Sequence, residues 1–257
     1  MSSNLVSLLA FIGMFAGAMV AQVAARRLSE HHVSARTQDT VKLGVGMVAA
    51  MTSLILGLMT ASVKSNFDST DKDVHTYALS ILSLETDLRH AGPAGCQPQM
   101  LLMDYTRAVL QENWTDTRDL PKTRTDTRSA DILLNLDTVI RTWAPDTELL
   151  KEVRAAAISD LRAILTTRWT VSEEAVASVP GPFILVLIIW LSLIFVSFGL
   201  FAPQNAIVSV FFFMCALSIA GALFLILEMS GPFDGLISVS PQPLVRALEF
   251  IQANGCK

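Results

Sequence analysis

One apolar segment of this chain carries small and hydroxyl-bearing residues at a helical spacing, and these are its clearest candidates for chemistry. Positions three and four residues apart fall on one side of a helix. Along and just after residues 41–63 they are Gly46, Ala50, Ser53, Gly57, Thr60 and Lys64. Small side chains let membrane helices approach closely, so helix packing is one interpretation of this face. The other is a pore lining, because hydroxyl groups and backbone can stabilise a hydrated ion. Packing is the role that we predict for Gly13, Gly17 and Ala21, which recur every four residues in the first apolar segment.

Acidic residues at the membrane boundary form a second set of candidates. Glu228 ends the last apolar segment, on the same side of the membrane as Lys64 and Asp68. A carboxylate at this depth is stable when it reaches water or pairs with a cation, and Lys64 is the candidate cation. Alternatively, copies of Glu228, Asp68 and Asp234 around an axis would form a charged ring at a pore mouth, which favours cations.

Catalytic and metal chemistry find little support in the residue pattern. Metal sites need converging histidine, cysteine or carboxylate ligands, whereas His75 and His90 have no second ligand one helical turn away. The Thr- and Asp-rich stretch 115–127 lacks the fixed ligand spacing of a calcium loop and reads as a solvated turn. We therefore expect no catalytic residue, no metal site and no cofactor.

Four apolar segments enclose a polar middle, and this layout decides the fold class. The segments are residues 5–25, 41–63, 183–202 and 206–227. Each is close to the ~20 residues that cross a bilayer as a helix, and lipid leaves the backbone no alternative partners. We predict an all-α integral membrane protein with four transmembrane helices and a helical extramembrane domain inserted between helices two and three. The net charge of −4 and the lack of a basic stripe argue against nucleic-acid binding.

The predicted organisation has four parts: transmembrane helices in 1–63, the helical domain in 64–180, transmembrane helices in 181–228 and an interfacial tail in 229–257. No glycine or proline interrupts the chain from Leu58 to Ala91, so the second membrane helix should continue into the domain until Gly92-Pro93 stops it. Beyond the membrane this helix carries a coiled-coil-like apolar stripe at spacings of three and four: Val74, Tyr77, Ile81, Leu84 and Leu88. Further helices are expected at 98–113, from a Ser129 cap to 143, from Pro145 to about 179, and at 244–253.

The basic residues predict on which side the domain lies. The loop after the first span is dense in them, with Arg26, Arg27, Arg36 and Lys42. The positive-inside rule favours this loop as cytoplasmic, which places both termini and the domain in the periplasm or outside the cell. Cys96 and Cys256 then share one side and can form a disulfide if that side is oxidising. Cys215 lies within a span and reads as a small packing residue.

The tail Ser230-Gly231-Pro232-Phe233-Asp234-Gly235 to Val239-Ser240-Pro241-Gln242-Pro243-Leu244 resembles the end of a bacterial membrane family called bestrophin-like. Asp234 stands where that family usually has serine, and Gln242 where an acid is common. The stretch from Leu56-Gly57-Leu58 to Phe67-Asp68 is similar to the family's second helix. The resemblance implies a protein of the bacterial inner membrane, and it transfers no catalytic residue.

Bestrophins proper form pentameric ion channels whose second membrane helix lines the pore. The resemblance therefore implies a homo-oligomer, a pentamer by resemblance alone, with the Ser53, Gly57 and Thr60 face as the conduit. Two departures stand against it: the second span has no Phe, Tyr or Trp to match the aromatic pore neck of bestrophins, and their acidic calcium clasp is missing. Bestrophins also keep the region between helices two and three in the cytosol, opposite to the side that the charges predict.

An oligomeric ion channel is therefore the leading functional hypothesis, with lipid and ions as its partners. A stator-type energy transducer shares the layout of two spans, a domain and two spans, but the bulky segment 183–202 lacks the small hydroxyl-rich face that such proteins need. A non-conducting sensor or scaffold is the third hypothesis, and it needs an unidentified membrane partner to carry its output.

Overall fold

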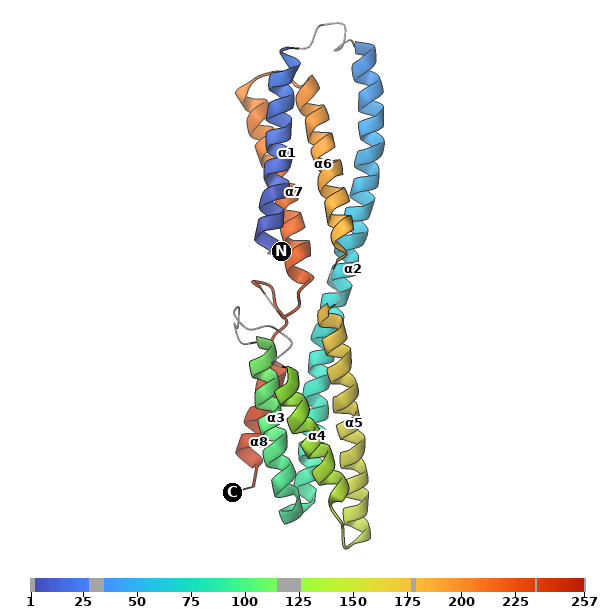
Figure 1. Cartoon of the computed structure of the whole chain (residues 1–257), viewed down its shortest axis with the longest axis vertical. Helices are drawn as coiled ribbons and strands as arrows, with labels where there is room; N and C mark the ends of the chain where they lie inside the picture. Colours follow the sequence, from blue (N-terminus) through green and yellow to red (C-terminus); the bar gives the residue numbers. More distant parts are fainter. Residues whose placement is uncertain (1–2, 28–34, 115–125, 177–178, 234, 257) are drawn as a thin grey trace. The chain divides into compact units, whose positions relative to one another are not determined.

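The structure, a computed structural model, describes residues 3–27, 35–114, 126–176, 179–233 and 235–256. These residues form helices and contain no strand (Figure 1). The helices are α1 (Ser3–Ala25), α2 (Ala35–His90), the 3-10 turn η1 (Gly92–Gly95), α3 (Cys96–Trp114), α4 (Asp126–Thr142), α5 (Glu148–Val176), α6 (Gly181–Phe201), α7 (Ala206–Met229) and α8 (Gln242–Asn254). They divide into a membrane unit, Met1–Asn66 with Ser178–Gly231, and a helical domain, Phe67–Ala177 with Pro232–Lys257.

The membrane unit contains α1, the first part of α2, α6 and α7. Among the described residues, four helices are long and apolar enough to cross a membrane, and they match the four predicted spans, the third of which extends one residue past its helix. The prediction of an all-α chain with four such segments is therefore confirmed. Asn205 begins α7 as its cap, because its side chain accepts a hydrogen bond of 2.8 Å from the Val208 amide and so satisfies a backbone donor that the first turn cannot.

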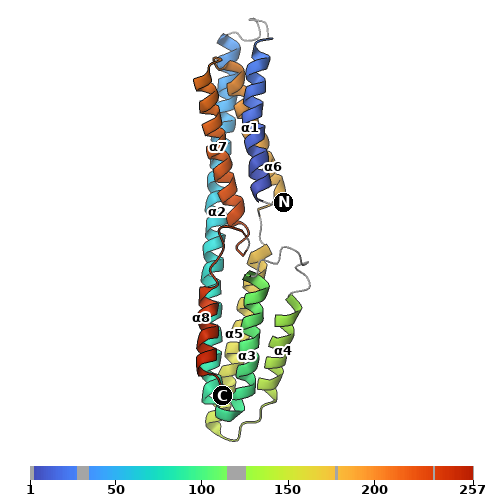
Figure 2. The ribbon, with the colours of Figure 1, turned by 90° about the vertical axis from the view of Figure 1, so that its left-hand side faces the viewer.

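Helix α1 lies beside α6 and α7 (Figure 2). Small residues bring it into close contact with α6. A Cβ atom on Gly13 would lie 3.3 Å from the Ser192 hydroxyl, and one on Gly17 would lie 3.0 Å from a Val196 methyl group. The packing role predicted for Gly13, Gly17 and Ala21 is thus confirmed for the two glycines. Ala10, Met14 and Ala18 on the same helix are fully buried.

Helix α2 continues without a break from the membrane unit into the helical domain. It ends at His90, and Gly92 follows with a φ of +63°, a left-handed conformation that glycine adopts without steric cost. The predicted stop at Gly92-Pro93 is therefore confirmed. The stripe predicted for the domain part of α2 is buried, with Val74, Tyr77, Ile81, Leu84 and Leu88 at most 2% exposed.

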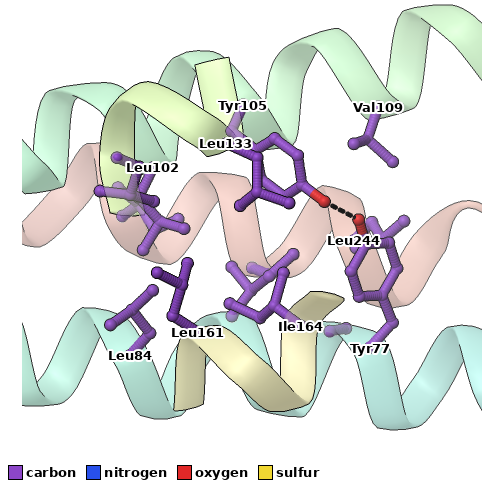
Figure 3. Packing of buried hydrophobic residues seen from close by; sticks show 14 of the residues in the cluster. Tyr77, Leu84, Leu102, Tyr105, Val109, Leu133, Leu161, Ile164 and Leu244 are labelled. Atoms are coloured by element: carbon purple, nitrogen blue, oxygen red, sulfur yellow. Dashed lines mark hydrogen bonds between the residues drawn. The ribbon is translucent and has the colours of Figure 1, made fainter. Parts of the chain in front are cut away.

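The core of the helical domain combines side chains from α2, α3, α4, α5 and α8 (Figure 3). Leu102, Leu133 and Leu161 face the α2 stripe from three different helices. Helix α8 joins them by burying Leu244, Ala247 and Ile251. The apolar face of the tail helix therefore belongs to this core, a role that the sequence interpretation did not give it.

Two predicted helix starts are wrong by about one turn. Helix α5 begins at Glu148 rather than at Pro145, because the Thr147 hydroxyl accepts the Leu150 amide at 3.3 Å and caps the helix. Helix α4 begins at Asp126, so Ser129 lies inside it instead of capping it. The polar stretch 115–125 lies outside the described residues.

The close contact between α1 and α6 predicts that substitution of a glycine in it lowers the stability of the protein. A Cβ atom on Gly199 would lie 2.3 Å from the Ala18 carbonyl oxygen and 2.9 Å from its Cα atom, whereas nothing lies within 4 Å of one on Gly221. The backbone of a helix cannot move aside as a flexible side chain can, so the added methyl group would clash with Ala18. We therefore expect Gly199→Ala to destabilise the protein by about 1–3 kcal/mol. The control Gly221→Ala should change stability by less than about 1 kcal/mol.

Thermal unfolding of the detergent-solubilised variants measures the difference. Equal midpoints for Gly199→Ala and Gly221→Ala would show that α1 and α6 are not in close contact at this point.

Candidate functional site

The small and polar face of α2 is exposed in the single chain. This holds for Gly46, Ala50, Ser53, Gly57, Thr60 and Lys64 alike. No atom of the described chain lies within 4 Å of a Cβ placed on Gly46 or Gly57. The two glycines therefore do not serve contacts within the chain, in contrast to Gly13 and Gly17 of α1. Packing against another copy and lining of a pore both stay open as roles for this face.

A different side of α2 contacts the other helices of the membrane unit. Thr52 and Val63 are buried, and Leu56 packs against the cluster formed by α1, α6 and α7. At 3.6 residues per turn these positions lie roughly a third of a turn from the Ser53 face. Helix α2 thus contacts the other membrane helices on one side, through Leu56, and leaves the small and polar face uncovered.

The remaining side of the membrane part of α2 carries large apolar residues that are also exposed. They are Leu43, Met47, Met51, Leu54 and Leu58. Apolar side chains of this size are stable against lipid or against another membrane helix. The contrast between this apolar side and the small and polar face shows that the exposed surface of α2 is not uniform.

The hydroxyl groups on α2 offer hydrogen-bond acceptors. The Thr60 hydroxyl donates to the Leu56 carbonyl at 2.8 Å, which uses its proton and leaves its lone pairs available. Thr52 makes the same bond to Val48 at 2.7 Å, but on the buried side of the helix. Thr60 can therefore present oxygen to a cation or to water on the exposed face.

The acidic boundary candidates occupy different positions. Glu228 lies in the last turn of α7 and is 8% exposed. Lys64 and Asp68 are exposed on α2, and Asp234 lies outside the described residues. A Lys64–Glu228 ion pair and an acidic pore mouth both stay predictions.

Cys96 and Cys256 are joined by a disulfide, with 5.4 Å between their Cα atoms. Cys96 is the first residue of α3, and Cys256 follows the end of α8. The bond connects residues 160 positions apart in the sequence. It therefore ties the end of the chain to the turn after α2.

A buried polar network that the sequence did not reveal crosses the helical domain. The Tyr77 and Tyr105 hydroxyl groups bond each other inside the core (Figure 3), and burial together with Tyr105 raises the pKa of Tyr77 above its ordinary value. Nearby, Arg168 donates to the Ser129 hydroxyl at 3.1 Å, and the Ser129 amide donates to Glu112 at 3.0 Å. The network joins α2, α3, α4 and α5 and resembles a structural support rather than a reactive centre.

The described residues contain no group of three His, Cys, Asp or Glu side chains that could hold a metal ion. The shallow pocket at the end of α8, lined by Gln99, Met103, Ile251 and neighbours, holds no nucleophile beside a base. The face of α2 is therefore the site with the clearest functional content.

The pattern of the bestrophin-like domain matches residues 12–244 of the chain. This chain belongs to the bestrophin-like family. Its fold is similar to crystal structures of two variants of a bacterial bestrophin homologue from Klebsiella pneumoniae. One has a TM-score of 0.68 at 15% identity, covering 96% of each chain. The other has a TM-score of 0.67 at 16% identity, covering 96% of this chain and 94% of that chain.

A crystal structure described as that of a membrane protein is also similar, with a TM-score of 0.63 at 18% identity and coverage of 95% of this chain and 96% of that one. No curated protein matches the chain. At these identities the likeness concerns the fold. It extends over both units of this bestrophin-like chain.

The exposed face of α2 predicts a difference in chemical reactivity. In a Cys215→Ser background, a cysteine at Ser53 should react with a charged, membrane-impermeant thiol reagent much faster than one at Leu54. The reason is that a thiol must ionise in water to react, and Leu54 lies on the apolar side of the helix. Intact-protein mass spectrometry of labelled membranes measures both rates. Equal rates would remove the distinction between the two sides.

Proposed function

We propose that this bestrophin-like chain is the subunit of a homo-oligomeric ion channel in which α2 lies nearest the axis. The observation that carries the proposal is the uncovered small and polar face of α2 beside a side that contacts the other membrane helices. Small and hydroxyl-bearing residues offer little apolar surface to lipid, and they suit close approach of a second helix or a water-filled path. They are stable against water or against a second copy of the same helix.

A closed ring of copies satisfies this requirement. Rotational symmetry presents the same face of every subunit to one axis. Gly46, Ala50 and Gly57 would then keep the path wide, and Ser53 and Thr60 would offer oxygen to the passing ion. Bestrophins form pentamers with their second helix at the pore, which supports the same arrangement here.

The acidic candidates suggest the sign of the ion. In a ring, the exposed Asp68 would be repeated once per subunit near one end of the membrane. Repeated carboxylates lower the energy of a cation and raise that of an anion at the pore mouth. We therefore propose a preference for cations.

The helical domain is placed on the periplasmic or outer side in this proposal. The disulfide between Cys96 and Cys256 belongs to that domain, and disulfides persist in oxidising compartments. Independently, basic residues are concentrated after α1, at the opposite ends of the spans. The two arguments use different residues and agree.

The proposed conduit can be tested by ion flux from liposomes that contain the purified protein. Ser53→Leu replaces a hydroxyl on the proposed path by a bulky apolar group, and we expect flux to fall at least about tenfold, equivalent to ~1.4 kcal/mol in the barrier. Ser62→Leu is the matched control, because Ser62 is exposed but lies about two and a half turns away, on the opposite side of α2.

Loss of flux in Ser53→Leu with normal flux in Ser62→Leu is the expected result. The absence of flux from the unmodified protein under gradients of Na⁺, K⁺ and Cl⁻ would contradict conduction and favour a non-conducting scaffold.

The proposed side of the domain predicts a protected cysteine pair. Alkylation of intact cells with an impermeant maleimide should leave Cys96 and Cys256 unmodified until a reductant is added, after which both should react. A pair that reacts without reductant only once the inner membrane is permeabilised would place the domain in the cytosol.

A further inference from the structure

A buried carboxyl group of the helical domain lies on α2, beside α3. Glu85 of α2 is fully buried. Its Oε1 accepts a hydrogen bond of 3.2 Å from the Gln99 amide of α3, and its Oε2 has no partner among the described residues. A buried carboxylate with an unsatisfied oxygen is costly, and the neutral acid is much less so.

Gln99 connects this carboxyl group to the end of the chain. Its Oε1 accepts the Cys256 amide at 3.2 Å, while its Nε2 donates to Glu85. Because the Cys256 amide can only donate, the Gln99 side chain cannot flip without losing the bond to Cys256. The segment just after α8 is thus bonded, through one side chain, to Glu85.

Arg89 forms a second connection between Glu85 and α8. Its guanidinium lies over the ring of Phe250 of α8, 5.4 Å from the centroid. Arg89 is also the charged group that favours the ionised form of Glu85, against the effect of burial. Ionisation of Glu85 draws Arg89 toward the carboxylate and away from Phe250.

The other charged groups around Glu85 act elsewhere. Helix α3 faces it with neutral Gln99, and the ionisable residues of α8, Arg246 and Glu249, are exposed. Asp87 of α2 interacts with Asp160 of α5 and with His90. Lys257 lies outside the described residues. Arg89 is therefore the cation on which the balance at Glu85 depends.

We propose that protonated Glu85 acts as a latch that keeps the C-terminal end of α8 packed on the helical domain. The Cys96–Cys256 disulfide keeps this end in place whether or not Glu85 is protonated. With Glu85 protonated, Gln99 and Arg89 hold the end of α8 on the domain. With Glu85 ionised, the buried charge is relieved by water entering beside Gln99, and the last turn of α8 loosens. The disulfide keeps the two segments together in either state.

The pKa of Glu85 sets the range in which the latch operates. Burial raises this pKa from its ordinary 4.5 to about 7. The folded domain therefore binds the proton more tightly than the unfolded chain does. The stability that this proton contributes is complete below the unfolded pKa of 4.5 and is lost as the pH rises through about 7.

Hydrogen exchange of the full-length protein in detergent tests the proposal, with rates corrected for intrinsic exchange at each pH. In the reduced protein, we expect protection of the last turn of α8 to fall about tenfold or more between about pH 5.5 and about pH 8.5. The oxidised protein should change little. Glu85→Gln, which is neutral at every pH, should stay protected in the reduced state at both values.

The control is Glu249→Gln, which removes the same charge from an exposed position of α8 and should behave as the unmodified protein. An equal loss of protection in reduced Glu85→Gln would overturn the proposal, as would constant protection in the reduced unmodified protein. If Glu85→Gln does not fold, the reduced unmodified protein decides alone: a midpoint near 7 supports the latch, and no transition refutes it. None of these outcomes depends on ion conduction.

Discussion

Helix α2 is the element on which the rest of the structure depends, and a constraint on its backbone explains why. In lipid every backbone donor and acceptor must be satisfied within the helix, and from Leu58 to Ala91 the sequence contains nothing that would end one. The helix therefore extends to His90. A single helix then supplies the exposed face of Ser53 and Thr60 in the membrane unit and the buried stripe from Val74 to Leu88 in the domain.

The features that follow from helix periodicity and length could be predicted from the sequence. Apolar length identified the four spans, the Gly92-Pro93 pair identified the end of α2, and the spacing of Gly13 and Gly17 identified a packing surface. The starts of α4 and α5 were wrong because a cap depends on one hydrogen bond. Each of Ser129, Pro145 and Thr147 is a residue type that is common near a helix start. For α5, the hydrogen bond between Thr147 and Leu150 determines where the helix begins.

The polar contacts between helices could not be predicted, for a different reason. In the sequence, the polar residues that make these contacts cannot be told from residues on a solvated helix face. They are Glu85, Gln99, Glu112 and Arg168. Whether such a residue meets water or another helix depends on rotation of the partner helix, which the local sequence does not encode. For the same reason, the sequence could identify the Ser53 face but could not exclude contacts with α1, α6 or α7. Only the fold reveals that the glycines on α2 are uncovered.

The contacts that build the fold and the residues from which we argue the orientation are separate parts of this chain. Packing of α1 against α6 and α7 is the same whichever end faces the cytoplasm, because it uses small and apolar side chains within the spans. The proposed sidedness is instead argued from the basic residues after α1. Arg26 donates to Gln204, and Gln22 contacts Pro203 and Gln204, so the loop between α6 and α7 lies at the same end as Arg26. That end combines concentrated positive charge with a short uncharged loop. A bestrophin-like fold can therefore insert with its helical domain outside, where a disulfide between Cys96 and Cys256 would persist, without any change in the contacts that hold its membrane helices together.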